Sequence, residues 1–208
     1  MTEYSYSVAD IEVLEFDAVV RKRPGMYFGV GPGSPKLPDS LLCAVARHVL
    51  HPATRVAAAH TLCGLVEITS DSSFTVAMDQ PHDWGAFGGP ELGYYDSLLG
   101  PEWWLLAAAA AVSRQVTVEM WCAGRGLCQE LRGIRPLGRP QEFHPAEGSG
   151  TRVSFAVDPA YVGEHFVFPT DLEKLDLHGP HCLEPAGPGS VLFRDVRDGH
   201  TTSESLHH

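Results

Sequence analysis

The chain has 208 residues and a mass of 22.6 kDa, and 44% of its residues are hydrophobic, which predicts one domain with a core of its own. Its formal net charge of -11 repels phosphate backbones. We therefore expect no nucleic-acid partner, although Arg21, Lys22 and Arg23 form a short basic run.

The first helix is predicted from Asp10, which can cap it, to Arg23, where Pro24 and Gly25 interrupt the hydrogen-bond ladder. The apolar residues between these ends recur at helical spacing and form one broad face. From there to residue 78 the sequence predicts, in chain order, a loop over 30–38, a helix over 41–50 that stops before Pro52, a helical piece over 53–63 ended by Gly64, and a hairpin of strands 65–69 and 74–78.

The second half of the chain predicts mostly strands. Pro101 suits the first position of a helix that runs from Glu102 to Val112, and its five consecutive alanines predict a buried helix. Thr170 and Glu173 have the spacing of a capping box for a short helix over 171–177. The other predicted elements are hairpin strands over 115–122 and 127–131, a loop over 138–150, and strands over 152–157 and 191–193.

Helices that come before and between antiparallel hairpins are typical of the α+β class. The order predicts a two-layer sandwich in which a mostly antiparallel sheet is covered on one face by helices. We expect this single domain to span residues 1–195. Residues 196–208 are expected to form a disordered or tag-derived C-terminal tail, because His207 and His208 are typical of a purification tag.

The cysteines and the apolar runs bear on the cellular setting. The five cysteines are scattered, with no Cys-x-x-Cys pair, which favours reduced thiols over disulfides or a zinc site. The longest apolar run, from Trp103 to Val112, is too short to cross a bilayer, and the acidic N-terminus is unlike a signal peptide. We therefore expect a cytoplasmic protein with no membrane partner and no bound metal.

Two stretches far apart in the sequence resemble the same protein family. The first comprises Tyr6–Glu15 and Val20–Gly29, and the second comprises Glu147–Phe155 followed by Asp158-Pro159. Both resemble the N-terminal ATPase domain of gyrase B and its topoisomerase IV counterpart, and the similarity extends over residues 4 to 175. It implies the gyrase-B-like ATP-binding sandwich, the GHKL fold that heat-shock protein 90 and histidine kinases also have.

At the positions that the family uses for ATP hydrolysis, this sequence departs from the pattern. The family's second helix carries a Glu that activates water and an Asn that holds Mg²⁺, and these positions correspond to Ala44 and His48. The family's Asp-x-Gly-x-Gly loop, whose Asp reads adenine, corresponds to Met78–Asp83, which keeps Asp79 but not the glycines. The glycine-rich lid shrinks to Leu99–Trp104. The resemblance therefore implies a degenerate member without ATP turnover or topoisomerase activity.

Titratable and aromatic side chains replace the missing elements around Asp79. Sites for small organic ligands combine apolar walls with a few titratable groups, so this replacement predicts a small-molecule substrate and no cofactor. We assign acid/base catalysis to His48, Asp79, His82 and Glu102, and substrate binding to Tyr27, Arg47, Trp84, Trp103, Trp104 and Thr151.

A histidine with a near-neutral pKa could abstract a proton, and a carboxyl group among tryptophans could stay protonated. The leading hypothesis is therefore a cofactor-independent lyase or cyclase that dehydrates, isomerises or cyclises a small organic substrate, as in natural-product biosynthesis. The alternative is a non-catalytic pseudo-ATPase that binds a nucleotide, a gyrase inhibitor or a gyrase-like partner, for regulation or self-resistance. The sequence leaves the oligomeric state open.

Several of these residues also have a purely structural interpretation. His48 could be a satisfied core histidine, and Trp103 and Trp104 could simply pack against neighbours. Asp79 could form a turn, and Glu102 could interact with the helix dipole. The sequence alone does not choose between these interpretations and the functional ones.

Overall fold

The computed structural model describes residues 14–50, 63–79, 89–145, 147–178, 189–201 and 203–207. The helices are α1 (Phe16–Lys22), α2 (Gly25–Phe28), α3 (Leu37–Leu50), α4 (Trp104–Ala111) and α5 (Pro159–Val162), and the 3-10 turns are η2 (Tyr94–Asp96), η3 (Pro101–Trp103) and η4 (Leu172–Lys174). The strands are β1 (Cys63–Ser70), β2 (Ser73–Met78), β3 (Ser113–Cys122), β4 (Arg125–Arg132), β5 (Arg135–Pro136), β6 (Gln141–Phe143), β7 (Gly150–Val157), β8 (Ser190–Asp195) and β9 (Ser203–His207).

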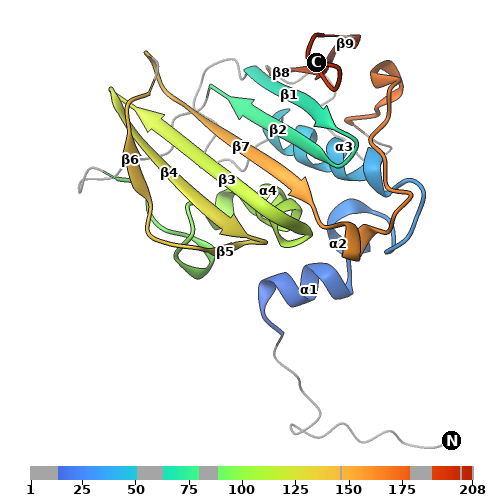
Figure 1. Cartoon of the computed structure of the whole chain (residues 1–208), viewed down its shortest axis with the longest axis horizontal. Coiled ribbons are helices and arrows are strands. Elements are labelled where there is room, and N and C mark those ends of the chain that lie inside the picture. Colours follow the sequence, from blue (N-terminus) through green and yellow to red (C-terminus); the bar gives the residue numbers. More distant parts are fainter. Residues whose placement is uncertain are drawn as a thin grey trace, which may run out of the picture.

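The strands form one large sheet, and α3 and α4 lie on the same face of it (Figure 1). The strand order is β5-β4-β3-β7-β2-β1-β8-β9, and β6 pairs with β4. Among the strands that the structure describes, β1 and β8 make the parallel pair and the other pairs are antiparallel. The predicted α+β class, with helices on one face of a mostly antiparallel sheet, is confirmed.

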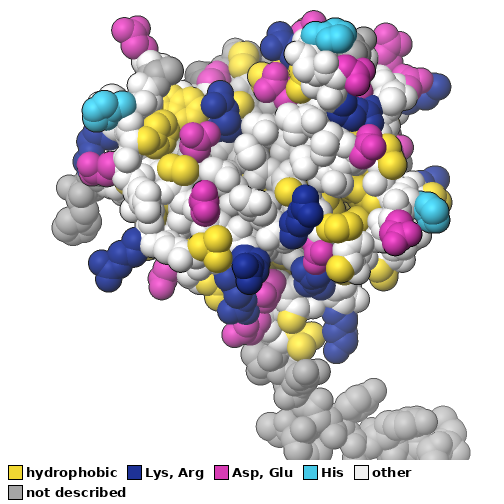
Figure 2. Space-filling model, viewed as in Figure 1, with side chains coloured by type: hydrophobic (Ala, Val, Ile, Leu, Met, Phe, Trp, Pro, Cys, Tyr) yellow, Lys and Arg dark blue, Asp and Glu magenta, His cyan; other side chains and the backbone are white. Residues whose placement is uncertain are grey.

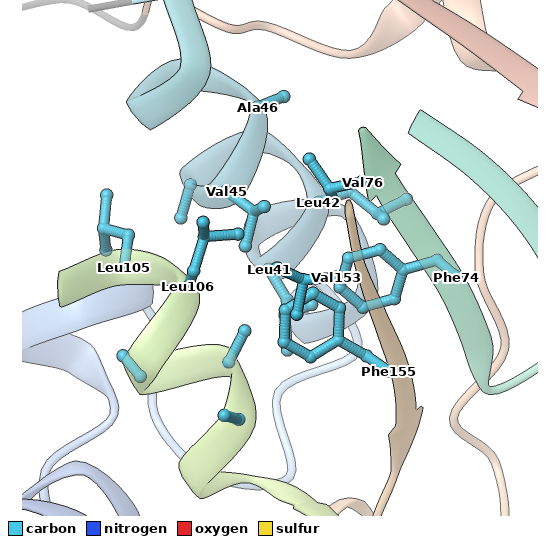
Figure 3. Packing of buried hydrophobic residues seen from close by; sticks show 14 of the residues in the cluster. Leu41, Leu42, Val45, Ala46, Phe74, Val76, Leu105, Leu106, Val153 and Phe155 are labelled. Carbon is cyan, nitrogen blue, oxygen red and sulfur yellow. The ribbon is translucent and has the colours of Figure 1, made fainter. Parts of the chain in front are cut away.

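The core lies between this face of the sheet and the two helices (Figure 3). The rings of Phe74 on β2 and Phe155 on β7 stack with their centroids 4.7 Å apart. Leu41, Leu42 and Val45 of α3 point toward these rings, and Leu106 of α4 lies beside them (Figure 3). The burial of α4 that its alanines predicted is confirmed, because every residue from Leu105 to Ala111 is buried.

Both predicted hairpins are present. In β1 and β2 the inward residues alternate with half-exposed ones, as period-two alternation requires for a strand with one covered face. The turn between β3 and β4 has Ala123 and Gly124 at positive φ, 50° and 79°, as in the two-residue turns that match strand twist. The 138–150 loop prediction is wrong in part, because β6 pairs with β4 inside it.

The predicted helical piece ending at Gly64 is also corrected at its end. Residues 51–62 lie outside the described ranges, but Cys63 and Gly64 already belong to β1. A Cβ atom on Gly64 would lie 2.6 Å from Cγ1 of Val49, so the glycine lets α3 approach the strand closely. Its role is this close approach and not a helix cap.

At the N-terminal end, α1 ends at Lys22 with Arg23 as its C-cap, as predicted. The predicted start at Asp10 is wrong, because Leu14 and Glu15 are not helical and α1 begins at Phe16, after the extended Glu15. After Pro24 the chain forms α2 in place of a simple turn. The second predicted helix starts earlier than expected, at Leu37, because Pro38 fits a first helical turn.

The C-terminal region differs most from the expectation. The predicted helix over 171–177 is the 3-10 turn η4, whose N-cap makes no side-chain hydrogen bond, so the Thr170 capping-box prediction is wrong. The buried residues Leu172, Leu175 and Leu177 lack the spacing of one helix face, so their burial requires an extended path after η4. In the predicted disordered tail, residues 203–207 form β9, which pairs antiparallel with β8.

Candidate functional site

The last turns of α3 hold His48 in a buried position, with 4% of its surface exposed. Its Nε2 lies 2.7 Å from the carbonyl oxygen of Glu102. Because a carbonyl only accepts hydrogen bonds, Nε2 carries the proton and donates. Burial lowers the pKa of His48, and this hydrogen bond opposes the shift only in part. The imidazole is therefore neutral at physiological pH, with its lone pair on Nδ1.

Aromatic rings surround this imidazole. Its centroid lies 5.4 Å from that of Trp103 and 5.9 Å from that of Trp104, both in edge-on geometry. Tyr27 on α2 reaches the same cluster, with its ring centroid 6.0 Å from that of Trp104. The structure thus brings together Tyr27, His48, Trp103, Trp104 and the backbone of Glu102.

The two tryptophans of this cluster have different environments. Trp103 is 1% exposed and is part of the core, whereas Trp104 is 38% exposed. The carboxylate of Glu102 does not join His48, because a Cβ on Gly100 would lie 2.4 Å from its Oε2, which places the carboxylate over Gly100. Within the described residues, Trp104 and the half-buried Tyr27 are the rings of this cluster that a ligand in solution could reach.

Arg47, the neighbour of His48, faces another segment. Its Nε donates to the carbonyl of Leu177 at 2.5 Å, and one Nη donates to the carbonyl of Asp176 at 3.4 Å. These bonds fasten the extended path after η4 to α3 and give Arg47 a structural role. Nearby, burial raises the pKa of Cys43 to about 11, so this thiol stays protonated and is not a nucleophile at neutral pH.

Asp79 lies at the end of β2, on the same sheet edge as the start of β7. Its Oδ1 accepts a hydrogen bond from the backbone N–H of Cys63 at 3.1 Å, and its side chain is otherwise exposed. The preceding residue, Met78, is the register partner of Thr151 on β7. Thr151 is fully buried, and its Oγ1 is without a hydrogen-bond partner among the residues that the structure describes. A buried unpaired hydroxyl is costly, so this atom suits a ligand or a water.

The start of β7 allows no side chain beside Thr151. A Cβ on Gly150 would lie 2.7 Å from the Trp121 ring and 2.8 Å from the carbonyl oxygen of Met78. Gly150 therefore lets β7 pack closely against Trp121 and the backbone of Met78 beside Thr151. His82 and Trp84, which we predicted to join this site, lie outside the described residues.

The segment around Leu99–Trp104, which the resemblance matched to a shortened lid, is packed into the body of the domain. Leu98 and Leu99 are buried, and the backbone N–H of Leu98 donates to Oε1 of Gln129 at 2.8 Å. The buried Gln129 amide also donates to the carbonyls of Asp96 and Gly138. Sequence reasoning missed Gln129, although a glutamine at an inward position of a strand was a usable signal. Gln129 thus fastens the segment that precedes α4 to strand β4.

The two stretches that carry the family resemblance contact each other. Nη2 of Arg21 donates to Oδ2 of Asp158 at 2.6 Å, and Nη1 donates to the carbonyl of Ala111 at 3.1 Å. The guanidinium also lies over the Tyr161 ring, 4.9 Å from its centroid, while the Tyr161 hydroxyl donates to the Arg21 carbonyl. These contacts join α1 to the end of β7, which gives Arg21 a structural role.

Three hollows formed by described residues lie away from the predicted site, with volumes of about 660, 720 and 330 Å³. The largest two are lined by residues from the β1–β2 and β8–β9 turns, and from η2 with residues 136–140. The smallest lies between α1 and the β4–β5 turn. Sequence reasoning missed all three, because each is lined by residues from elements far apart in the chain.

The described part of the chain shows neither a metal-binding cluster nor a membrane-spanning helix. Within it, no set of three or more His, Cys, Asp and Glu side chains is arranged to hold a metal ion. None of its helices has the length and apolar composition needed to cross a membrane.

Comparison with known proteins gives two relatives and no matching protein-family model. The chain is 30% identical over 184 residues to the B subunit of DNA topoisomerase 4 from Caulobacter vibrioides, a match that covers 76% of this chain and 25% of that protein. It is also 30% identical over 182 residues to the B subunit of DNA gyrase from Synechocystis sp., covering 76% of this chain and 16% of that protein. The chain thus spans a quarter or less of the length of these relatives.

Proposed function

This chain is a distant relative of the B subunits of topoisomerase IV and DNA gyrase, and we propose that it is a pseudo-ATPase: a domain that binds a nucleotide without hydrolysing it. The observation that carries the proposal is the buried Thr151 hydroxyl, which has no hydrogen-bond partner among the described residues and lies on β7 across from Met78, the residue before Asp79. A carboxylate that accepts and a hydroxyl that donates or accepts suit the polar edge of a planar base.

The surroundings of Ala44 and His48 on α3 support the proposed absence of ATP hydrolysis. Ala44 stands where the resemblance places the water-activating Glu, and it is buried among apolar neighbours. His48 is at the Mg²⁺ position, but a hard cation prefers oxygen ligands, and its Nε2 is already bonded to Glu102. In the segment that the resemblance matches to the lid, Leu99–Trp104, the backbone N–H of Leu99 is already bonded to the Ser97 hydroxyl.

Calorimetric titration with ATP, ADP and an aminocoumarin gyrase inhibitor tests this function. We expect ATP and ADP to bind with similar affinity, since no contact to a third phosphate is proposed. Asp79→Asn and Thr151→Val should each weaken binding about tenfold, the loss of one hydrogen bond to the ligand. Thr117→Val is the matched control, because Thr117 is half-exposed on β3 away from this edge.

Two results would contradict the proposal. If no nucleotide or inhibitor bound the wild-type protein, the binding function would be excluded. Phosphate release from ATP above background, lost in Asp79→Asn, would exclude the non-hydrolysing part and make the domain an ATPase.

A second candidate is the acid/base enzyme of lyase or cyclase type. The neutral imidazole of His48 beside Trp103 and Trp104 favours it, because a general base at neutral pH needs this protonation state. Its base would be Nδ1, since Nε2 donates to Glu102. Metabolite profiles of cells with wild type or His48→Gln should then differ by an accumulated substrate. Identical profiles would exclude this candidate.

A further inference from the structure

The hollow between α1 and the β4–β5 turn lies at the opposite end of β7 from Thr151. It has a volume of about 330 Å³ and is lined by Asp17 and Arg21 of α1, Ala111, Ser113, Arg114, Arg132, Gly133, Ile134 and Asp158. Lys and Arg side chains gather with Asp and Glu side chains at this end of the sheet, beside α1 (Figure 2). Its volume is at the small end of the range for ligand sites.

Both carboxylates that line the hollow are already paired. Asp158 is bonded to Arg21, and its Oδ1 accepts from the backbone N–H of Ala160. Asp17 accepts from Nε of Arg135 at 2.9 Å and from the Tyr95 hydroxyl at 3.0 Å. These carboxylates are therefore not available to neutralise the other two arginines.

Arg114 and Arg132 are those two arginines. Among the described residues neither guanidinium has a hydrogen bond or ion pair, although each carries five donors. The chain as a whole has a net charge of -11, so two arginines in one small hollow, with no partner in the described part of the chain, contrast with the overall negative charge.

The backbone places both side chains at this hollow. Arg114 is the extra residue of a bulge, because Ser113 pairs with Val157 and Gln115 with Ala156, and bulges redirect a side chain. Arg132 lies directly opposite Arg135 across the β4–β5 pair, an arrangement of like charges that costs stability. Arg135 is bonded to Asp17 and Glu15, so these two carboxylates do not pair with Arg132.

We propose that Arg114 and Arg132 form a binding site for a phosphate group, separate from the nucleotide site. A carboxylate offers two coplanar oxygens, which one arginine fork can occupy, whereas a tetrahedral dianion presents further oxygens to a second arginine from another strand. The C-terminal end of α4 would repel an anion, but the Ala111 carbonyl there is capped by Arg21. The ligand is inorganic phosphate or a small phosphate ester.

Titration of the full chain with inorganic phosphate, followed by NMR or calorimetry, tests the site. Arg114→Gln and Arg132→Gln should each weaken phosphate binding by about tenfold or more, since each removes a charge-assisted hydrogen bond. The matched control is Arg139→Gln, an exposed arginine that lines the hollow near η2 and should leave binding unchanged. Parallel titrations with glycerol phosphate and with succinate show whether the site binds a phosphate ester or a dicarboxylate more tightly than inorganic phosphate.

Thermal unfolding without phosphate separates binding from a structural role. Arg132→Gln should not lower the midpoint, because it removes a like-charge pair with Arg135. Thr151→Val should leave phosphate binding unchanged, which keeps this site distinct from the proposed nucleotide site. Phosphate binding that is absent, that persists in both arginine variants, or that is weaker than succinate binding would overturn the proposal.

Discussion

Thr151 and His48 are buried polar residues with opposite hydrogen-bond status. The His48 ring has an acceptor in the Glu102 carbonyl, whereas the Thr151 hydroxyl has no partner among the described residues. Burying an unpaired hydroxyl costs stability, and burying a bonded neutral imidazole does not, as long as it stays neutral. The two residues therefore respond differently to substitution and to pH.

Thr151→Val should leave the ligand-free protein as stable as the wild type or more stable by about 1 kcal/mol, because it replaces an unpaired hydroxyl with a methyl group. Denaturant unfolding without ligand measures this. A hydroxyl with a purely structural role would give the opposite sign, a loss of stability, while Thr117→Val serves as the control for β-propensity.

His48→Gln should flatten the dependence of stability on pH. Burial lowers the pKa of His48 below its ordinary value of 6.5, so between the two pKa values the unfolded chain binds more protons. The wild type should thus lose stability as the pH falls below 6.5. Glutamine keeps an N–H donor toward Glu102 but does not titrate. The exposed His165→Gln is the control, and equal pH profiles for wild type and His48→Gln would contradict the prediction.

At the scale of secondary-structure elements, the contact between α3 and β1 depends on one glycine. Gly64 lies in β1 opposite Val49 of α3, and a methyl group there would overlap Cγ1 of Val49 and crowd Cγ2 of Val191. Valine side chains in a helix have one preferred rotamer and cannot turn aside cheaply. Gly64 therefore lets α3 pack at this short distance from β1.

Gly64→Ala should destabilise the domain by about 1–3 kcal/mol, the usual cost of overpacking a core. The measurement is thermal or denaturant unfolding of Gly64→Ala, Val49→Ala and the double variant. We expect the double variant to be more stable than the sum of the single effects predicts, because the clash is then absent. Additive effects would show that the two residues do not press on each other.

The sheet of the whole molecule continues to residue 207. His207 in β9 packs edge-on against Phe193 of β8, with ring centroids 5.2 Å apart, and its Nε2 lies 3.2 Å from the Leu172 carbonyl. Residues 203–207, which we predicted to belong to a tail, therefore extend the sheet beside β8, the strand that is parallel to β1.

A chain shortened to end at residue 201 should lose about 1–3 kcal/mol of stability, because Phe193 gains exposure and β8 loses a partner strand. Thermal unfolding of the shortened and full chains measures the difference. Leu206→Ser, at an exposed position of the same strand, should change stability by less than about 0.5 kcal/mol. Equal midpoints for both chains would contradict a structural role for β9.

Local patterns predicted the elements whose periodicity is strong. The alternation in β1 and β2, the alanines of α4 and the Pro24 boundary each express a rule that acts within a few residues. The family motifs added the order of the layers. Weak patterns such as the capping box at Thr170 were wrong, because burial of Leu175 and Leu177 decided the path.

The sequence by itself determined the α+β architecture and the departure from the family pattern at Ala44 and His48, since residue type and spacing are local properties. Only the tertiary structure decided which side chains have hydrogen-bond partners. Arg47 is bonded to a carbonyl of the segment after η4, His48 to the carbonyl of Glu102, and Arg21 to Asp158. It likewise decided which groups have no such partner among the described residues, namely the Thr151 hydroxyl and the two arginines of the small hollow. Hydrogen bonds between residues far apart in the chain depend on packing, and sequence spacing does not encode them.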